Sequence, residues 1–381
     1  MLRNSPHIDA GTVLYIEQRP NAPFRYDAWI RTAYEKLLQL ADGQVPIDLP
    51  GAFITDPALR HTIATGLDRG HFRDTTHVEE WLAAVNRDFE QLDNNEIPPL
   101  HLKVVHAETD IDLLKRVMID EGHRPAGVYL SGSPKMIPKT IHTDPAVMQT
   151  AEVCEYLLEH NIPMLGICFG LQLLGYVKWG AMVDSLINPP RMRLRVLQEK
   201  PKRIVHPITP GAQQRNFGVY PIELRNSDHP ILRDVSQPYG LKSHSTYFPF
   251  PHPVIPADAV LATSARRFLP DHHAPTDEEL TDRVIEVLQY GAVAFGTQLH
   301  PEFTPDLLLA LTHLPVVEQE LKTEGLHVEF IREQLRPLSA DDSTLQRFGY
   351  NFTKYYLVPQ YLERLLRHSQ RRETTRKSTT M

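Results

Sequence analysis

A short apolar run that passes through a cysteine directly into a helical pattern constrains this chain more than any other feature. Residues 163–179 read PMLGICFGLQLLGYVKW, and Cys168 has a glycine two positions away on each side. A sharp strand-to-helix turn needs glycine at both places, because a side chain there would collide with neighbouring backbone. Such a turn puts Cys168 at a helix N-terminus, whose partial positive charge favours the thiolate. The pattern therefore predicts a nucleophile rather than a structural cysteine.

Similar apolar runs recur along the chain and predict buried strands. They cover residues 13–17, 101–106, 127–130, 163–167 and 292–299. Helical patterns, including those at 111–121 and 147–159, lie between several of these runs. Strands that alternate with helices form a mainly parallel sheet covered on both faces, so we expect an α/β, doubly wound fold. Reactive groups in such folds gather at the carboxyl ends of the strands.

Three regions depart from this alternation. Residues 24–100 contain helical stripes, one of them from Val78 to Phe89 with a cap predicted at Thr76, and we expect a helical insertion after the first strand. The centre, 194–265, has short extended runs that favour an antiparallel or mixed extension of the sheet.

The third region begins near residue 315. It has a helical pattern through Leu366 and then a basic stretch, from which we expect a helical C-terminal extension that ends in an uncompacted tail. The predicted organisation is therefore a domain over residues 1–314, including the insertion, and an extension over residues 315–381.

Composition narrows the classes of function. The formal net charge is -7, which argues against nucleic acid as a partner, because nucleic-acid binders normally carry a basic excess. We find no run of about 18 apolar residues and no signal-peptide pattern at the start, so we expect no membrane partner and a cytoplasmic location. The two cysteines, Cys154 and Cys168, are too few for a disulfide scaffold. Cys154 lies inside a helical pattern and is expected in the core.

A second motif supplies a base for the nucleophile. The apolar run at 292–299 ends in His300-Pro301-Glu302. A histidine at a strand end can deprotonate Cys168 and then protonate a departing amine. Glu302, two residues on, can orient the imidazole and stabilise its protonated form. His-Pro pairs occur elsewhere in the chain, so this motif indicates a catalytic base only in combination with the cysteine turn.

A third motif offers stabilisation of negative charge. The run at 127–130 ends in a turn of small residues, Ser131-Gly132-Ser133-Pro134. Backbone N–H groups exposed in such a turn, together with the N–H of Phe169 after the nucleophile, can bind the oxyanion of a tetrahedral intermediate.

In this order, the three motifs resemble those of class I glutamine amidotransferases, the Cys-His-Glu triad type. The resemblance covers residues 11–25 and about 100–305. It implies that Cys168, His300 and Glu302 are catalytic. It also implies that the backbone of Gly132 and Ser133 binds glutamine together with Gln172, and that Phe169 contributes an N–H group.

The resemblance is weaker around Leu241-Lys242-Ser243-His244-Ser245, which occupies the place of a family segment that approaches the substrate. His244 is therefore a candidate substrate contact, although Ser245 and Thr246 replace the family's usual glycine and aspartate. The pair His272-His273 lies in a loop rich in Pro and Asp without a second cluster at ligand spacing, so we predict no metal site and no cofactor.

The resemblance implies that the chain hydrolyses the side-chain amide of glutamine through a cysteine thioester and supplies the ammonia to a synthetase. We find neither a phosphate-binding G-x-x-x-x-G-K-S/T loop nor an S-G-G-x-D-S signature, so we expect the acceptor synthetase to be a separate partner. Two alternatives stay open. One is hydrolysis of other γ-glutamyl amides, and the other is a non-catalytic regulatory or scaffold member of the fold.

Overall fold

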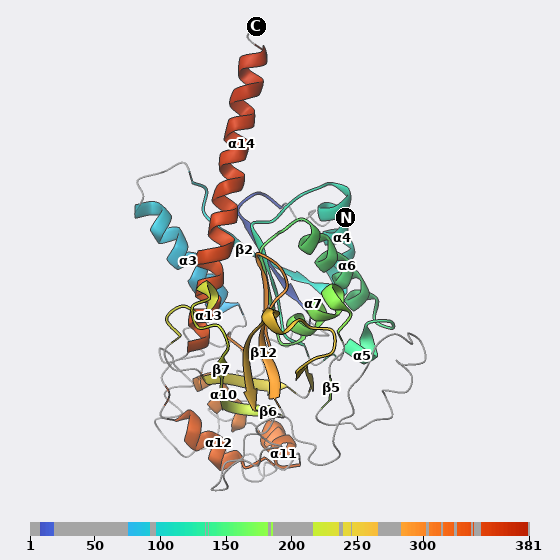
Figure 1. Cartoon of the computed structure of the whole chain (residues 1–381), viewed down its shortest axis with the longest axis vertical. Coiled ribbons are helices and arrows are strands. Elements are labelled where there is room, and N and C mark those ends of the chain that lie inside the picture. Colours follow the sequence, from blue (N-terminus) through green and yellow to red (C-terminus); the bar gives the residue numbers. More distant parts are fainter. Residues whose placement is uncertain are drawn as a thin grey trace, which may run out of the picture.

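The predicted α/β fold with a mainly parallel sheet is confirmed by the structure, a computed structural model (Figure 1). It describes residues 8–18, 75–91, 97–133, 135, 137–181, 184–185, 216–235, 239–244, 246–265, 283–301, 305–313, 315–323, 326–336, 338 and 344–379. Most of the predicted insertion, residues 24–74, lies outside this part of the chain, as does the loop around His272.

Nine strands of the described residues form the main sheet. Eight of them run in the order β2-β1-β3-β4-β13-β12-β11-β7, and β10 pairs with β12. Their bounds are β1 (Thr12–Glu17), β2 (His101–His106), β3 (Gly127–Leu130), β4 (Met164–Ile167), β7 (Glu223–Leu224), β10 (Pro249–Phe250), β11 (Val260–Ala265), β12 (Arg283–Gln289) and β13 (Ala294–Thr297). Two small antiparallel sheets join β5 (Asp184–Ser185) to β9 (Thr246–Tyr247), and β6 (Asn216–Pro221) to β8 (Tyr239–His244).

The sheet has a parallel half and an antiparallel half. Pairing is parallel from β2 through β1, β3 and β4 to β13. From β13 onward, β12, β11 and β7 pair antiparallel. All five strands predicted from apolar runs form, and they make up the whole parallel half. The expected antiparallel extension is also present, formed largely by the central region.

Helices cover both faces of the sheet. The α-helices of the described residues are α3 (Thr76–Gln91), α4 (Ala107–Lys115), α5 (Ile137–Thr140), α6 (Pro145–Glu159), α7 (Phe169–Trp179), α10 (Pro305–Thr312), α11 (Pro315–Thr323), α12 (Val328–Leu335), α13 (Thr344–Phe352) and α14 (Val358–Thr379). Shorter helical turns are η1 (Arg116–Asp120), η2 (Pro230–Leu232), η3 (Ala257–Ala259) and η5 (Thr353–Leu357). Figure 1 shows α4, α6 and α7 on one side of the sheet and α3, α13 and α14 on the other.

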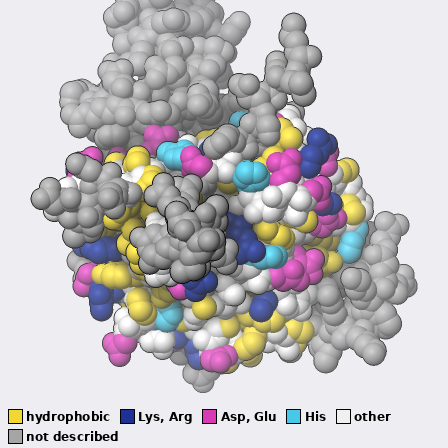
Figure 2. Space-filling model, turned by 90° about the horizontal axis from the view of Figure 1, so that it is seen from above, with side chains coloured by type: hydrophobic (Ala, Val, Ile, Leu, Met, Phe, Trp, Pro, Cys, Tyr) yellow, Lys and Arg dark blue, Asp and Glu magenta, His cyan; other side chains and the backbone are white. Residues whose placement is uncertain are grey.

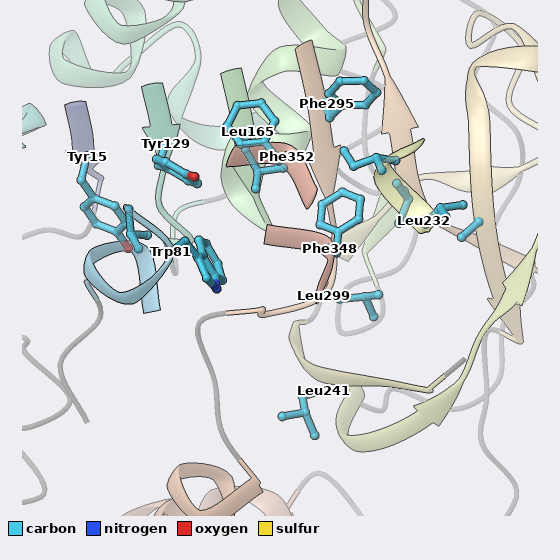
Figure 3. Close-up of a cluster of buried hydrophobic side chains, with 14 of the residues drawn as sticks. Tyr15, Trp81, Tyr129, Leu165, Leu232, Leu241, Phe295, Leu299, Phe348 and Phe352 are labelled. Carbon is cyan, nitrogen blue, oxygen red and sulfur yellow. The ribbon is translucent and has the colours of Figure 1, made fainter. Parts of the chain in front are cut away.

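Strand alternation divides the core between the two faces. On β1, Tyr15 belongs to the cluster under α3 and α13, whereas Leu14 belongs to the cluster under α4, α6 and α7. Figure 3 shows Tyr129 of β3 beside Trp81 of α3 and Phe352 of α13, with ring centroids 6.0 and 5.4 Å from Tyr129. The inner parallel strands β1, β3 and β4 are buried on both faces because each face is covered by helices, whereas the edge strand β2 is only partly buried.

Local capping explains where several helices begin. Asp144 accepts hydrogen bonds from the N–H groups of Ala146 and Val147, and Pro145 fills the first helical position of α6. The helix predicted from residue 111 begins instead at Ala107, where the Asp110 carboxylate accepts from the N–H of the cap residue His106 and satisfies one of the free N–H groups at this helix start.

The chain end and the start of α3 differ from the prediction. Thr76 is the first residue of α3 rather than its cap, and the carbonyl of the preceding Thr75 accepts from the N–H of Glu79. The basic stretch predicted to be an uncompacted tail is helical, since α14 continues to Thr379 and projects beyond the sheet (Figure 1). The first turns of α14 are packed against the domain, and Tyr361 is fully buried there. This packing stabilises the helix, whose basic end would not be stably helical by itself.

Candidate active site

Cys168 lies at a strained turn between β4 and α7. Its backbone angles are φ 51° and ψ -101°, a conformation that residues other than glycine rarely adopt. The turn is held on both sides, because the Cys168 N–H donates to the carbonyl of Thr297 at 2.7 Å and the Cys168 carbonyl accepts from the N–H of Gln172 at 3.2 Å. Strained backbone of this kind concentrates at functional sites.

The two flanking glycines make the turn sterically feasible. A Cβ atom added to Gly166 would lie 2.6 Å from the backbone of Gly170. A Cβ atom added to Gly170 would lie 2.7 Å from the carbonyl oxygen of Leu130. Both distances are shorter than real Cβ contacts, so any side chain here would push α7 away from β3 and β4.

Three neighbouring parallel strands deliver the three motifs to one edge of the sheet. Leu130 of β3 pairs with Gly166 of β4, and Ile167 of β4 pairs with Thr297 of β13. The small-residue turn, the cysteine and the histidine follow these strand ends.

Gly132 is the point at which the motifs meet. A Cβ atom added to Gly132 would lie 3.1 Å from Cε1 of His300 and 3.5 Å from Cβ of Cys168. The structure therefore brings Gly132, Cys168 and His300 together, at the carboxyl edge where an α/β sheet carries its reactive groups.

His300 is held in place through its backbone. Its N–H donates to the carbonyl of Leu241 in β8 at 3.1 Å, and the residue is buried. Glu302, predicted to orient the imidazole, lies outside the described residues, so its role stays a prediction.

The small-residue turn is fixed to the end of β1. The Ser131 hydroxyl donates to the Glu17 carboxylate at 3.0 Å and accepts from the Gln18 N–H at 2.9 Å. The Ser133 hydroxyl donates to the carbonyl of Gln18 at 3.0 Å. The Ser131 N–H also donates to the carbonyl of Ile16 at 3.0 Å, so two hydroxyls and one backbone N–H anchor the turn to β1. This anchoring is compatible with Gly132 and Ser133 N–H groups that receive an oxyanion.

A buried amide network leads to the sulfur. Gln298 donates from Nε2 to Cys168 Sγ at 3.3 Å and accepts at Oε1 from Gln172 Nε2 at 3.0 Å. Gln172 also donates to the carbonyl of Thr246 at 3.1 Å and accepts from its hydroxyl at 3.1 Å. Gln172 is only 1% exposed, so in this structure it contacts the network, and its predicted contact with glutamine stays a prediction.

Gln298 is a site residue that sequence reasoning missed. The available signal was an amide side chain in an otherwise apolar strand, two residues before His300. A buried amide in such a place requires hydrogen-bond partners, which here include the cysteine sulfur.

His244, the remaining candidate, is buried at the end of β8. It lies in the chain between Leu241, which bonds His300, and Thr246, which bonds Gln172. Phe169 is the first residue of α7 and is also buried. The contacts of His244 and Phe169 with substrate stay predictions.

The second cysteine provides an internal contrast. Cys154 is fully buried in α6, as expected, and burial raises the pKa of its thiol to about 12. At neutral pH it is an inert core thiol.

Within the described residues, no group of three His, Cys, Asp or Glu side chains could hold a metal ion. None of the described helices is both long and apolar enough to cross a membrane.

Comparison with known proteins defines the class. The family model described as "Glutamine amidotransferase class-I" matches residues 96–308, more than half of the chain. The chain therefore belongs to the class I glutamine amidotransferase family. The matched region contains the cysteine turn, the His300 strand and the small-residue turn.

Similar solved structures include a glutamine amidotransferase from Thermotoga maritima. It is 16% identical, with a TM-score of 0.44, and the match covers 71% of this chain and 90% of that one. A glutamine amido transferase from Methylobacillus flagellatus is 15% identical, with a TM-score of 0.44, and the match covers 75% and 88%. No curated protein matches the chain.

Proposed function

We propose that the chain is a glutaminase that uses Cys168 as its nucleophile. The observation that carries this proposal is the meeting of Cys168, in a strained turn at the start of α7, with Gly132 and His300 at one edge of the sheet. Membership of the class I glutamine amidotransferase family supports the same chemistry.

The first half-reaction forms a thioester. His300 accepts the Cys168 thiol proton, and the thiolate attacks the side-chain carbonyl carbon of glutamine. The negative charge on the carbonyl oxygen is stabilised by the N–H groups of Gly132, Ser133 and Phe169. His300 then returns its proton to the amide nitrogen, the C–N bond breaks, and ammonia leaves.

The second half-reaction releases glutamate. Water, deprotonated by His300, attacks the thioester carbonyl, and the C–S bond breaks to restore Cys168. Glu302 orients His300 through both halves. Gln298 contributes by holding the sulfur with its N–H group, as the 3.3 Å contact supports.

The ammonia goes to a separate synthetase, by our proposal. The family that the chain belongs to and the lack of a nucleotide-binding signature in the sequence support this partner. The helical segments outside residues 96–308 are candidates for its docking surface, and we place the protein in the cytoplasm.

The test is release of glutamate from glutamine by the full chain, with labelling by the glutamine-mimicking electrophile diazo-oxonorleucine. We expect one label per chain, on Cys168. The Cys168→Ala variant should lose both glutamate release and labelling. The control is Cys154→Ala, which removes the inert thiol and should keep activity. No glutamate release with candidate synthetases present, or labelling unaffected by Cys168→Ala, would contradict the proposal.

The same assay distinguishes the alternatives. A hydrolase of γ-glutamyl amides would cleave γ-glutamyl amines faster than glutamine, because the bond cleaved is again a γ-carbonyl amide. A regulatory or scaffold member would take no label at Cys168.

A further inference from the structure

The edge of the sheet opposite Cys168 carries a cavity. Its volume is about 570 Å³, and it is lined by three segments that are far apart in the sequence. These segments are the chain leading into β1, the loop that precedes β3, and the middle of α14. Since β1 and β3 both begin at this edge, the cavity lies at the amino ends of the parallel strands, away from the catalytic edge.

Arginine and histidine side chains dominate this lining. Arg124 comes from the loop before β3, and Arg364 and Arg367 come from α14. The same three arginines also line a neighbouring recess of about 420 Å³ that reaches the starts of β4 and β13. His123 and His368 complete the basic lining of the larger cavity. Figure 2 shows basic and histidine side chains close together near the middle of the face towards which α14 projects.

Arg364 is anchored as a fixed donor. Its Nη1 and Nη2 atoms donate to the carbonyls of Pro125 and Ala126, at 2.5 and 2.7 Å. Burial and, second, the neighbouring charge of Arg124 lower its pKa to about 10, so the guanidinium remains charged at neutral pH. This anchoring holds α14 against the loop that carries Arg124.

The positive charge in the cavity is only partly compensated. Arg367 pairs with Glu363 one turn away on α14. Within the described residues, neither Arg124 nor Arg364 forms an ion pair with a carboxylate. The Asp9 carboxylate, which also lines the cavity, accepts hydrogen bonds from the N–H of Gly11 and the hydroxyl of Thr12. Arg124 and Arg364 are two neighbouring positive charges without a carboxylate partner, so binding of an anion between them is favourable.

We propose that this arginine cavity binds a phosphorylated small molecule. The guanidinium group of Arg124 can match phosphate oxygens in a two-pronged geometry, whereas Arg364, whose Nε, Nη1 and Nη2 atoms donate to backbone carbonyls, contributes mainly its charge. A dianion compensates two charges better than a single carboxylate does. The volume exceeds what a phosphate group fills and lies within the range of small-molecule sites. The net charge of -7 disfavours an extended polyanion such as nucleic acid, which leaves a small ligand as the occupant.

The experiment is calorimetric titration of the full chain in phosphate-free buffer near pH 8, where a phosphate ester is a dianion. The probes are inorganic phosphate and glucose 6-phosphate, with glucose and acetate as ligand controls. We expect saturable binding of one phosphate probe per chain, tighter for glucose 6-phosphate, and no binding of glucose or acetate.

Variants locate the binding. Arg124→Gln and Arg367→Gln, both at exposed positions, should each weaken phosphate binding about tenfold or more, because each removes a hydrogen bond to a charged group. Arg87→Gln, at an exposed position on α3, is the matched control and should bind as the unchanged protein does. Unsaturable binding, or equal weakening in all three variants, would overturn the proposal. Because the readout is binding, the result is independent of glutaminase activity.

Discussion

The parallel and antiparallel halves of the sheet support the site in different ways. In the parallel half, β3 and β4 are fully buried apolar strands, and the Cys168 turn is held by backbone hydrogen bonds and close glycine contacts. The antiparallel half instead buries charge where the small β6–β8 sheet packs against it: Lys242 Nζ of β8 lies 2.5 Å from Oε1 of Glu286 in β12, and both side chains are fully buried. The position of Cys168 thus depends on backbone packing, whereas a buried charged pair lies behind the segment that carries His300.

The buried pair adjoins both strands that hold the histidine segment. Leu241, next to Lys242, accepts the His300 N–H, and Glu286 accepts the Gln298 N–H through its own carbonyl. The Ser264 hydroxyl lies between the charges, accepting from Lys242 at 2.5 Å and donating to Glu286 at 2.6 Å. The pair therefore bonds β8 to β12 directly behind residues 298–300.

Breaking this pair should give the largest loss of stability. Burial outweighs the attraction of Glu286 and lowers the pKa of Lys242, so the charges are held at a cost. Lys242→Met leaves Glu286 buried without its cation and should cost about 3–5 kcal/mol of unfolding free energy. The measurement is urea unfolding followed by circular dichroism.

Two further variants sharpen that result. Lys242→Met with Glu286→Leu should recover much of the loss, because no unpaired charge remains. Lys322→Met, at a solvent-exposed helix pair with Glu318, should change stability by about 0.5 kcal/mol or less. If the buried and the exposed variants lose the same amount, the antiparallel half does not depend on its charges.

A single added methyl group should destabilise the parallel half. Gly166→Ala places a Cβ atom 2.6 Å from the Gly170 backbone, and overpacking of this kind costs about 1–3 kcal/mol. Gly291→Ala is the matched control, since nothing lies within 4 Å of its added Cβ atom. Thermal unfolding of the two variants measures the difference. Equal midpoints would show that the turn at Cys168 is not tightly packed.

Sequence patterns predicted the parallel half much better than the antiparallel half. Its strands are apolar runs that local pattern alone marks as buried, so His101–His106 and Gly127–Leu130 form as predicted. The Cys168 turn could be located because its glycines are a local steric requirement. The family of the chain was also predicted correctly from these motifs.

The antiparallel half depends on pairing that local pattern does not specify. Lys242 and Glu286 lie in short extended runs, and only long-range packing puts their charges within contact distance. Gln298 has the same character, because its bond to the Cys168 sulfur joins the ends of two different strands. The helix was predicted only as far as Leu366, and its continuation to Thr379 was missed because the packing that supports it lies at Tyr361 and Arg364, far from its basic end.

Gln298 lies at the border of the two halves, and its substitution should have the smallest effect. Gln298→Leu removes the N–H that donates to Cys168 Sγ. A hydrogen bond donated to the thiolate that forms once His300 has accepted the proton contributes about 1.5 kcal/mol, so kcat/KM for glutamine should fall about tenfold. The fall should be in kcat rather than KM, because the amide contacts the nucleophile. Gln289→Leu, at the end of β12, should leave both constants unchanged, since its Nε2 donates to the exposed turn at Gly291. A fall in kcat/KM caused by a higher KM alone would mean that Gln298 binds substrate. The position of the Cys168 sulfur would then depend on the parallel half alone.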